Sequence, residues 1–87
     1  MKRSPDFLLQ DVAGTMVIVP VGKAVSAFPG MIAVNGTGAY IWELLETEQT
    51  VETLTQALVD RYEVDSDNAR QDVEAFVNKL QPTGALI

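Results

Sequence analysis

The spacing of apolar residues changes from a strand-like to a helical pattern near Asn35. Three short apolar runs precede it, rich in β-branched residues and separated by glycine and proline: residues 7–12, 15–22 and 28–34. Runs of this kind predict strands. Ala13-Gly14 predicts a tight hairpin turn between the first two runs, and residues 23–28 a loop or a ragged extension of the second or third strand. Because no crossover helix fits between the runs, the sheet is predicted to be antiparallel, at least across the first hairpin.

The segment after Asn35 predicts a helix that is buried on nearly every side. Asn35 can cap this helix with its side-chain oxygen, while Gly36 and Gly38 permit a sharp reversal from strand to helix. The helix then carries apolar residues around its circumference, at Ala39, Tyr40, Ile41, Trp42, Leu44 and Leu45. A helix that is apolar all round belongs in the core, so this one is expected at the centre of the fold.

Two further helices are predicted from capping residues and helical spacing. Thr50 and Asp65 are both N-capping residues, each with an acidic side chain in the following turn. The second helix has an apolar stripe at Val51, Leu54, Leu58 and Tyr62, and the third at Ala69, Val73, Phe76, Val77 and Leu80. Pro82 and Gly84 are expected to end the third helix, and the tail of residues 85–87 to pack against the core.

The predicted order of elements is therefore βββααα, a winged-helix-like α+β fold with a small antiparallel three-stranded sheet followed by three helices. The 87 residues have room for one core, so residues 1–87 are expected to form a single domain. No run approaches the ~20 apolar residues that span a bilayer, and the first residues lack the apolar centre of a secretory signal. We therefore expect a cytoplasmic protein without a membrane partner.

Composition excludes several kinds of chemistry. The chain has no cysteine and no histidine, which excludes disulfides, thiol nucleophiles, zinc clusters, haem ligation and the usual acid–base residue near neutral pH. The acidic run that starts at Asp65 lacks the glycine and the terminal glutamate of a calcium loop. Gly36-Thr37-Gly38 lacks the third glycine of a dinucleotide-binding turn. We expect no catalytic residue, no metal site and no cofactor, and hence a protein that is not an enzyme.

Two other functions stay open on these patterns. The last two helices could form a helix-turn-helix, in a winged-helix regulatory or interaction domain that binds DNA or protein. The polar face of the third helix carries Asp67, Asp72 and Glu74 among its basic and amide side chains, and 12 acidic against 6 basic residues give a net charge of −6. This charge disfavours nucleic acid as a partner. The chain could also be a structural subunit that holds a larger enzyme together through apolar patches.

The chain resembles the PqqD family, the small proteins of pyrroloquinoline quinone (PQQ) biosynthesis and their relatives in other peptide-modification systems. The residues that carry the resemblance are Val34-Asn35, Thr37-Gly38-Ala39, Ile41-Trp42 with Leu44-Leu45, Thr50-Val51-Glu52 with Leu54, Leu58 with Tyr62 and Val64, Asp72-Val73 with Phe76, and Leu80 with Gly84. Together they cover nearly the whole chain, more closely from residue 31 onward than in the first two strands.

The resemblance implies a module that recognises peptides. Family members bind the leader segment of a ribosomally made precursor peptide and present it to a modifying enzyme, often a radical SAM enzyme. The leader adds as a strand to the edge of the third strand and lies in a groove against the third helix. Carried over by position, the binding residues are Met31, Ile32, Ala33 and Val34 on the strand and Asn68, Asp72, Ala75, Phe76 and Lys79 on the helix.

The third strand has the properties that strand addition requires. Between Gly30 and Asn35 it has no charged residue and no proline, so the sequence predicts an edge that nothing blunts. An unpaired edge supplies main-chain hydrogen bonds to a peptide of any sequence, while nearby side chains select among peptides. The same edge could pair with a second copy of the chain, so a homodimer is also consistent with the sequence.

Overall fold

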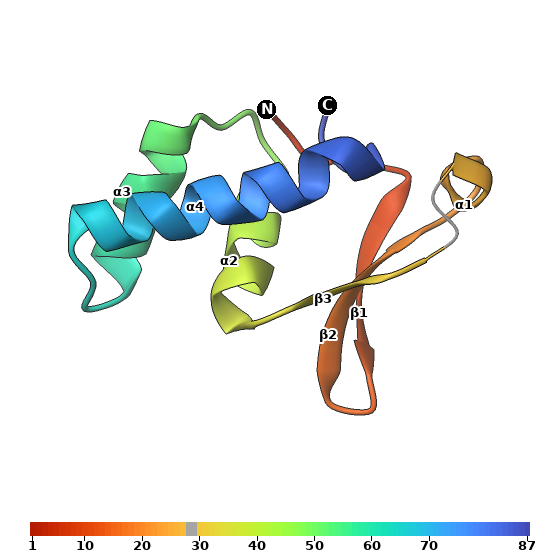
Figure 1. Cartoon of the computed structure of the whole chain (residues 1–87), viewed down its shortest axis with the longest axis horizontal. Helices are drawn as coiled ribbons and strands as arrows, with labels where there is room; N and C mark the ends of the chain where they lie inside the picture. The colour runs from red at the N-terminus through yellow and green to blue at the C-terminus, as the bar shows by residue number, and fades with distance from the viewer. Residues whose placement is uncertain (28–29) are drawn as a thin grey trace.

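Three strands form an antiparallel sheet in the order β1-β2-β3 (Figure 1). They are β1 (Phe7–Val12), β2 (Thr15–Pro20) and β3 (Ile32–Val34), in a computed structural model that describes residues 1–27 and 30–87. Phe28 and Pro29, which the sequence placed in the third strand-like run, lie outside the described residues. Ala13 and Gly14 join β1 to β2 with φ angles of 53° and 86°. Two successive left-handed residues match the twist of a hairpin, which confirms the predicted turn.

A short helix, α1 (Ala24–Ala27), lies between β2 and β3. The sequence predicted a loop or a ragged strand extension here, and that prediction was wrong for these four residues. Gly22 adopts a left-handed φ of 58°, and the amide of Ala24 donates to the carbonyl of Val21 at 3.2 Å. A single helical turn that follows a glycine is too short to leave a periodic apolar pattern in the sequence.

Three longer helices follow, as predicted: α2 (Gly36–Leu44), α3 (Val51–Arg61) and α4 (Ser66–Leu80), with a short 3-10 helix, η1 (Gln81–Thr83), after the last. The three predicted capping residues all act as caps. The side-chain oxygens of Asn35, Thr50 and Asp65 accept the backbone N–H three residues further on, at 2.8, 3.1 and 2.8 Å. Each bond satisfies an amide that the first helical turn leaves without a partner.

The hydrophobic core joins the sheet to all three longer helices. Ile18 and Ile32 lie opposite each other in β2 and β3 and are both buried. Trp42 of α2 is 2% exposed, which confirms the predicted central place of this helix, although Tyr40 and Leu44 on its flanks are half-buried. All five residues of the predicted α4 stripe are buried: Ala69, Val73, Phe76, Val77 and Leu80. The core therefore holds α4 by one face.

The apolar stripe predicted for α3 is correct for Leu54 and Leu58 but not for Tyr62. The helix ends at Arg61, and Tyr62 is extended and 38% exposed. Its ring packs edge-on against Tyr40 with centroids 6.0 Å apart, and the Arg61 guanidinium lies 5.9 Å from the Tyr62 ring centroid and 5.1 Å from that of Tyr40. Tyr62 thus makes aromatic and cation contacts at the surface instead of filling the core.

The two ends of the chain pair with each other (Figure 1). The amide of Lys2 donates to the carbonyl of Ile87 at 2.9 Å, and the amide of Ile87 to the carbonyl of Lys2 at 2.8 Å. Ala85 is fully buried, which confirms that the tail packs against the core, whereas Ile87 is 65% exposed. The fold is thus the predicted α+β arrangement with α1 added. Within residues 1–27 and 30–87, no helix has the length and apolar character needed to cross a bilayer.

Asp65 should contribute to stability mainly as the cap of α4. Replacing it by alanine removes the acceptor for the Asn68 amide, so we expect the free energy of unfolding to fall by about 1 kcal/mol. Asparagine at this position keeps an acceptor oxygen, so Asp65→Asn should lower the free energy of unfolding much less than Asp65→Ala. Urea unfolding of the three proteins makes the comparison, and an alanine variant as stable as the wild type would contradict the capping role.

Candidate functional site

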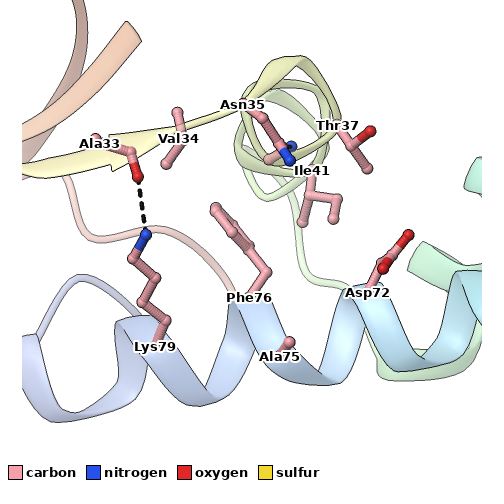
Figure 2. A pocket seen from close by; sticks show the side chains of 10 residues that line it. Ala33, Val34, Asn35, Thr37, Ile41, Asp72, Ala75, Phe76 and Lys79 are labelled. Atoms are coloured by element: carbon pink, nitrogen blue, oxygen red, sulfur yellow. Dashed lines mark hydrogen bonds between the residues drawn. The ribbon is translucent and has the colours of Figure 1, made fainter.

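A cavity of about 260 Å³, called the groove below, lies between β3, the first turn of α2 and one face of α4 (Figure 2). Ten residues line it: Ala33, Val34, Asn35, Thr37, Gly38, Ile41, Asp72, Ala75, Phe76 and Lys79. Because the strand order is β1-β2-β3, the strand that borders the groove is an outer strand of the sheet. The groove therefore joins a sheet edge to a helix.

The walls of the groove meet at Gly38. Asn35 follows β3 directly and caps α2, so the strand and the helix share one sharp turn. A Cβ atom on Gly38 would lie 3.0 Å from Cε1 of Phe76 and 3.2 Å from Cβ of Val34. These distances are shorter than ordinary van der Waals contact. The missing side chain at position 38 thus lets α2 touch α4 and the end of β3 at the same place.

Lys79 connects the two sides of the groove. Its ammonium donates a hydrogen bond of 2.8 Å to the backbone carbonyl of Ala33 (Figure 2). In an antiparallel pair, successive residues turn their backbone groups alternately toward and away from the neighbouring strand. Val12 and Thr15 flank the two-residue hairpin turn, so Thr15 and Val17 turn their backbone groups toward β1. Ala33 is the partner of Val17 in β3, and its backbone groups therefore face away from β2. Ala33 is therefore a residue of β3 to which an added strand would bond.

The edge of β3 is protected by a lysine from α4. The sequence predicted an edge that nothing blunts, and that prediction was wrong. The strand itself has no charged residue, but α4 places a lysine on the outward carbonyl of Ala33. A lysine at a sheet edge disfavours pairing with other chains. Lys79 and Ala33 are 46 residues apart in the sequence, so no pattern within the strand could indicate the contact.

The groove carries two charges on the same face of α4. Asp72 and Lys79 are about two helical turns apart, ~10 Å along the axis at 1.5 Å per residue. The Phe76 ring projects from the helix between them toward β3 and α2 (Figure 2). Both charged residues are exposed, and Phe76 is 8% exposed. The groove thus has a negative end, a positive end and an apolar surface between the two.

Six of the nine residues predicted to bind a peptide line the groove: Ala33, Val34, Asp72, Ala75, Phe76 and Lys79. The other three do not. Ile32 is 6% exposed and belongs to the core, while Met31 is 60% exposed and precedes β3. The side-chain amide of Asn68 bonds to the carboxylate of Asp65 at 2.9 Å, so Asn68 supports the cap of α4 instead.

Four groove residues were not predicted as binding residues: Asn35, Thr37, Gly38 and Ile41. All four belong to the strand-to-helix turn or the helix after it, to which the sequence assigned a structural role. The position of the turn is the signal that could have found them. A helix that begins where an edge strand ends must border whatever lies beside that edge.

The other described residues form a second cavity but no metal-binding cluster. Residues 1–27 and 30–87 contain no cluster of three or more acidic side chains that could hold a metal ion. A second cavity, of about 570 Å³, lies between the N-terminal segment, β1 and α2, with Glu43 and Glu46 among its lining residues. None of the predicted binding residues lines it. The groove is therefore the candidate site.

Comparison with known proteins places the chain in a family. The family model for coenzyme PQQ synthesis protein D (PqqD) matches residues 15–86, a range that includes every groove residue. The chain belongs to the PqqD family. This match confirms the resemblance inferred from the sequence. It begins at β2, so residues 1–14 of this PqqD-family chain, which include β1, lie outside it, as does residue 87. No curated protein sequence matches the chain.

Two solved structures share the fold of this PqqD-family protein. One is described as TbiB1 in complex with the TbiA(beta) leader peptide; it is 22% identical, with a TM-score of 0.74 over 99% of this chain and 94% of that chain. The other is described as lasso peptide synthetase B1 complexed with the leader peptide; it is 24% identical, with a TM-score of 0.71 over 95% of this chain and 92% of that chain. The likeness establishes the fold along nearly the whole chain.

The two glycines of the strand-to-helix turn should respond differently to alanine. A Cβ at Gly36 meets nothing within 4 Å, so Gly36→Ala should leave the free energy of unfolding unchanged or raise it by about 0.5 kcal/mol. Gly38→Ala must displace Phe76 and Val34, and we expect a net loss of about 1–2 kcal/mol despite the better helix propensity. Urea unfolding measures both variants. Equal stabilities would contradict the close packing at Gly38.

Proposed function

We propose that this protein is a non-catalytic module that binds the leader segment of a ribosomally synthesised precursor peptide and presents it to a modifying enzyme. The leader adds as a strand beside β3 and places its side chains in the groove against α4. The substrate class is leader peptides in general, of PQQ-like and related pathways, because none of the groove residues has chemistry specific to a quinone precursor.

The observation that carries this proposal is the position of the groove between an outer strand and a helix. The outward backbone groups of Ala33 can bond to a peptide of any sequence, whereas Phe76 and Asp72 contact its side chains. An extended peptide is the ligand that uses both features. Its backbone matches the repeat of the strand, and its alternate side chains point toward the helix.

The comparisons support a leader peptide as the occupant. Both structural neighbours are described as complexes with a leader peptide, and the chain shares their fold over 99% and 95% of its length. It also belongs to a family named for a biosynthetic pathway. These likenesses favour a leader segment over other extended peptides.

A binding role without chemistry has a separate basis. The chain has no cysteine or histidine, and the ionisable side chains of the groove, Asp72 and Lys79, lie about two helical turns apart. In the structure the Lys79 ammonium bonds to Ala33 at one end of the groove and Asp72 lies at the other, so the two groups do not converge on one point (Figure 2). The chemistry would then belong to a partner, for which the family resemblance suggests a modifying enzyme such as a radical SAM enzyme. That enzyme would act on the part of the peptide that extends beyond the groove.

Titration of isotope-labelled protein with synthetic leader peptides, followed by amide shifts in NMR spectra, tests the proposal. A bound peptide of this length would bury ~1,200 Å² or less in total, which is typical of transient complexes, so we expect micromolar to submicromolar affinity. Saturable shifts should gather at residues 33–38 and 72–79. Shifts confined to other residues would exclude the groove. Shifts with duplex DNA and with none of the peptides would favour a winged-helix regulator.

Replacing Ala33 by proline should weaken peptide binding about tenfold or more. Proline removes the outward N–H and leaves a peptide carbonyl without its donor, which costs about 1–3 kcal/mol. Because that N–H faces away from β2, the variant should still fold. Ala33→Ser keeps the N–H with a side chain of similar size and should bind like the wild type.

Asn68→Ala gives a second control for this measurement. Asn68 was predicted as a binding residue but contacts Asp65 outside the groove, so its loss should leave peptide affinity unchanged. Isothermal titration calorimetry of the three variants makes the comparison. Wild-type affinity in Ala33→Pro would contradict strand addition at this edge.

A further inference from the structure

Lys79 is the basic residue that lines the groove, and its hydrogen-bond partner is a backbone carbonyl. Its ammonium lies 2.8 Å from the Ala33 oxygen. The ion pairs found among residues 1–27 and 30–87 involve Met1, Arg70, Glu48, Glu52 and Glu74, and none includes Lys79. The helical neighbours one turn away from Lys79 on the groove side are Ala75 and Phe76, which carry no charge. Among the described residues, the Lys79 ammonium therefore pairs with no carboxylate.

The contact occupies the atom that strand addition needs. A peptide that extends the sheet beside β3 must donate a backbone N–H to the outward carbonyl of Ala33. Lys79 already donates to that oxygen from the groove side. That oxygen could accept a second hydrogen bond, but the Lys79 side chain crosses from α4 to β3 through the space that an added strand would fill (Figure 2). The peptide must therefore move the ammonium aside, and the displaced cation then lies beside the bound backbone, within reach of the peptide's side chains.

We propose that Lys79 caps the edge of β3 in the free protein and, once displaced, selects a peptide that carries an aspartate or glutamate beside it. This inference rests on the proposed function and adds the chemistry of the substrate. The peptide N–H replaces the ammonium on the Ala33 carbonyl, and the peptide carboxylate replaces that carbonyl as the partner of Lys79. Binding of an acidic peptide thus leaves each of these groups with a hydrogen-bond partner.

Asp72 fixes the direction of this charge preference. It lines the same groove about two turns from Lys79, at the end where Thr37 of α2 also lies (Figure 2). An acid at that end would meet a like charge, whereas a basic or neutral residue would not. Side chains on one face of an extended strand are two residues apart, so three of them span ~13 Å, which is close to the ~10 Å between the two helical positions. The preferred peptide therefore has an acid at one end, an apolar residue over Phe76, and a basic or neutral residue at the other end.

Selection of peptides from a displayed library of random linear twelve-residue sequences tests the proposal. The library is selected in parallel on the wild type, Lys79→Glu, Lys79→Met and Lys23→Glu, after circular dichroism has shown that each variant is folded. Lys23 lies in the turn before α1 and does not line the groove, so Lys23→Glu makes the same change in net charge elsewhere. One enriched peptide from each pool is then mapped on the protein by NMR.

The wild type and Lys23→Glu should enrich Asp or Glu at one position, at a fixed distance from the apolar residues. Lys79→Glu should keep the apolar positions and enrich Lys or Arg in place of the acid, and Lys79→Met should lose the charge preference. Peptides that map to the groove but show the same preference in all four pools would overturn the role of Lys79 and leave the proposed function standing. Pools without any common sequence, or peptides that map elsewhere, would overturn both.

The affinities of single peptides distinguish the two roles proposed for Lys79, as a cap on the Ala33 carbonyl and as the partner of a peptide acid. Changing the enriched acid of the peptide to its amide should weaken binding to the wild type about two- to fivefold, as for an exposed ion pair. The same change should have no effect on binding to Lys79→Met. The amide peptide should bind Lys79→Met more tightly than the wild type, because no ammonium has to leave Ala33. If the amide peptide bound Lys79→Met more weakly than the wild type, this would contradict the proposal that Lys79 caps the Ala33 carbonyl.

Discussion

The contact between Gly38 and Phe76 is the one on which the arrangement of the site depends. Phe76 belongs to the buried face of α4, and Gly38 lies in the first turn of α2, directly after β3. Because position 38 has no side chain, the aromatic ring can fill the corner between the strand end and the helix. The ring is held by the same core that stabilises the whole fold. The groove is therefore a property of the core packing and not of a loop added to it.

The elements of the fold were predictable where local patterns determine them. The caps at Asn35, Thr50 and Asp65, the buried stripe of α4 and the Ala13-Gly14 turn all follow from a few neighbouring residues. The helix α1 was missed because one turn leaves no periodic signal. Tyr62 was misplaced because helical spacing does not reveal that α3 ends one residue earlier, where the ring finds partners at the surface.

The site could be predicted on the helix side better than on the strand side. Asp72, Phe76 and Lys79 share one face of α4, and helical spacing alone brings them together. On β3, four consecutive residues were predicted, although side chains along a strand alternate between faces and Ile32 therefore belongs to the core. The contact between Lys79 and Ala33 depends on how α4 crosses the sheet edge, which is a result of tertiary packing.

A groove built from core residues also determines which molecule loses conformational freedom when a ligand binds. Phe76, Ile41 and Gly38 are already buried in the free protein, so their rotamers and backbone are fixed before any peptide arrives. In the proposed complex, the backbone ordering would then fall mainly on the peptide, at roughly 1–2 kcal/mol for each residue that becomes fixed. For a flexible ligand this entropy opposes most of the energy of contact. The affinity of the proposed complex would thus be governed as much by the disorder of the peptide as by the surface that receives it.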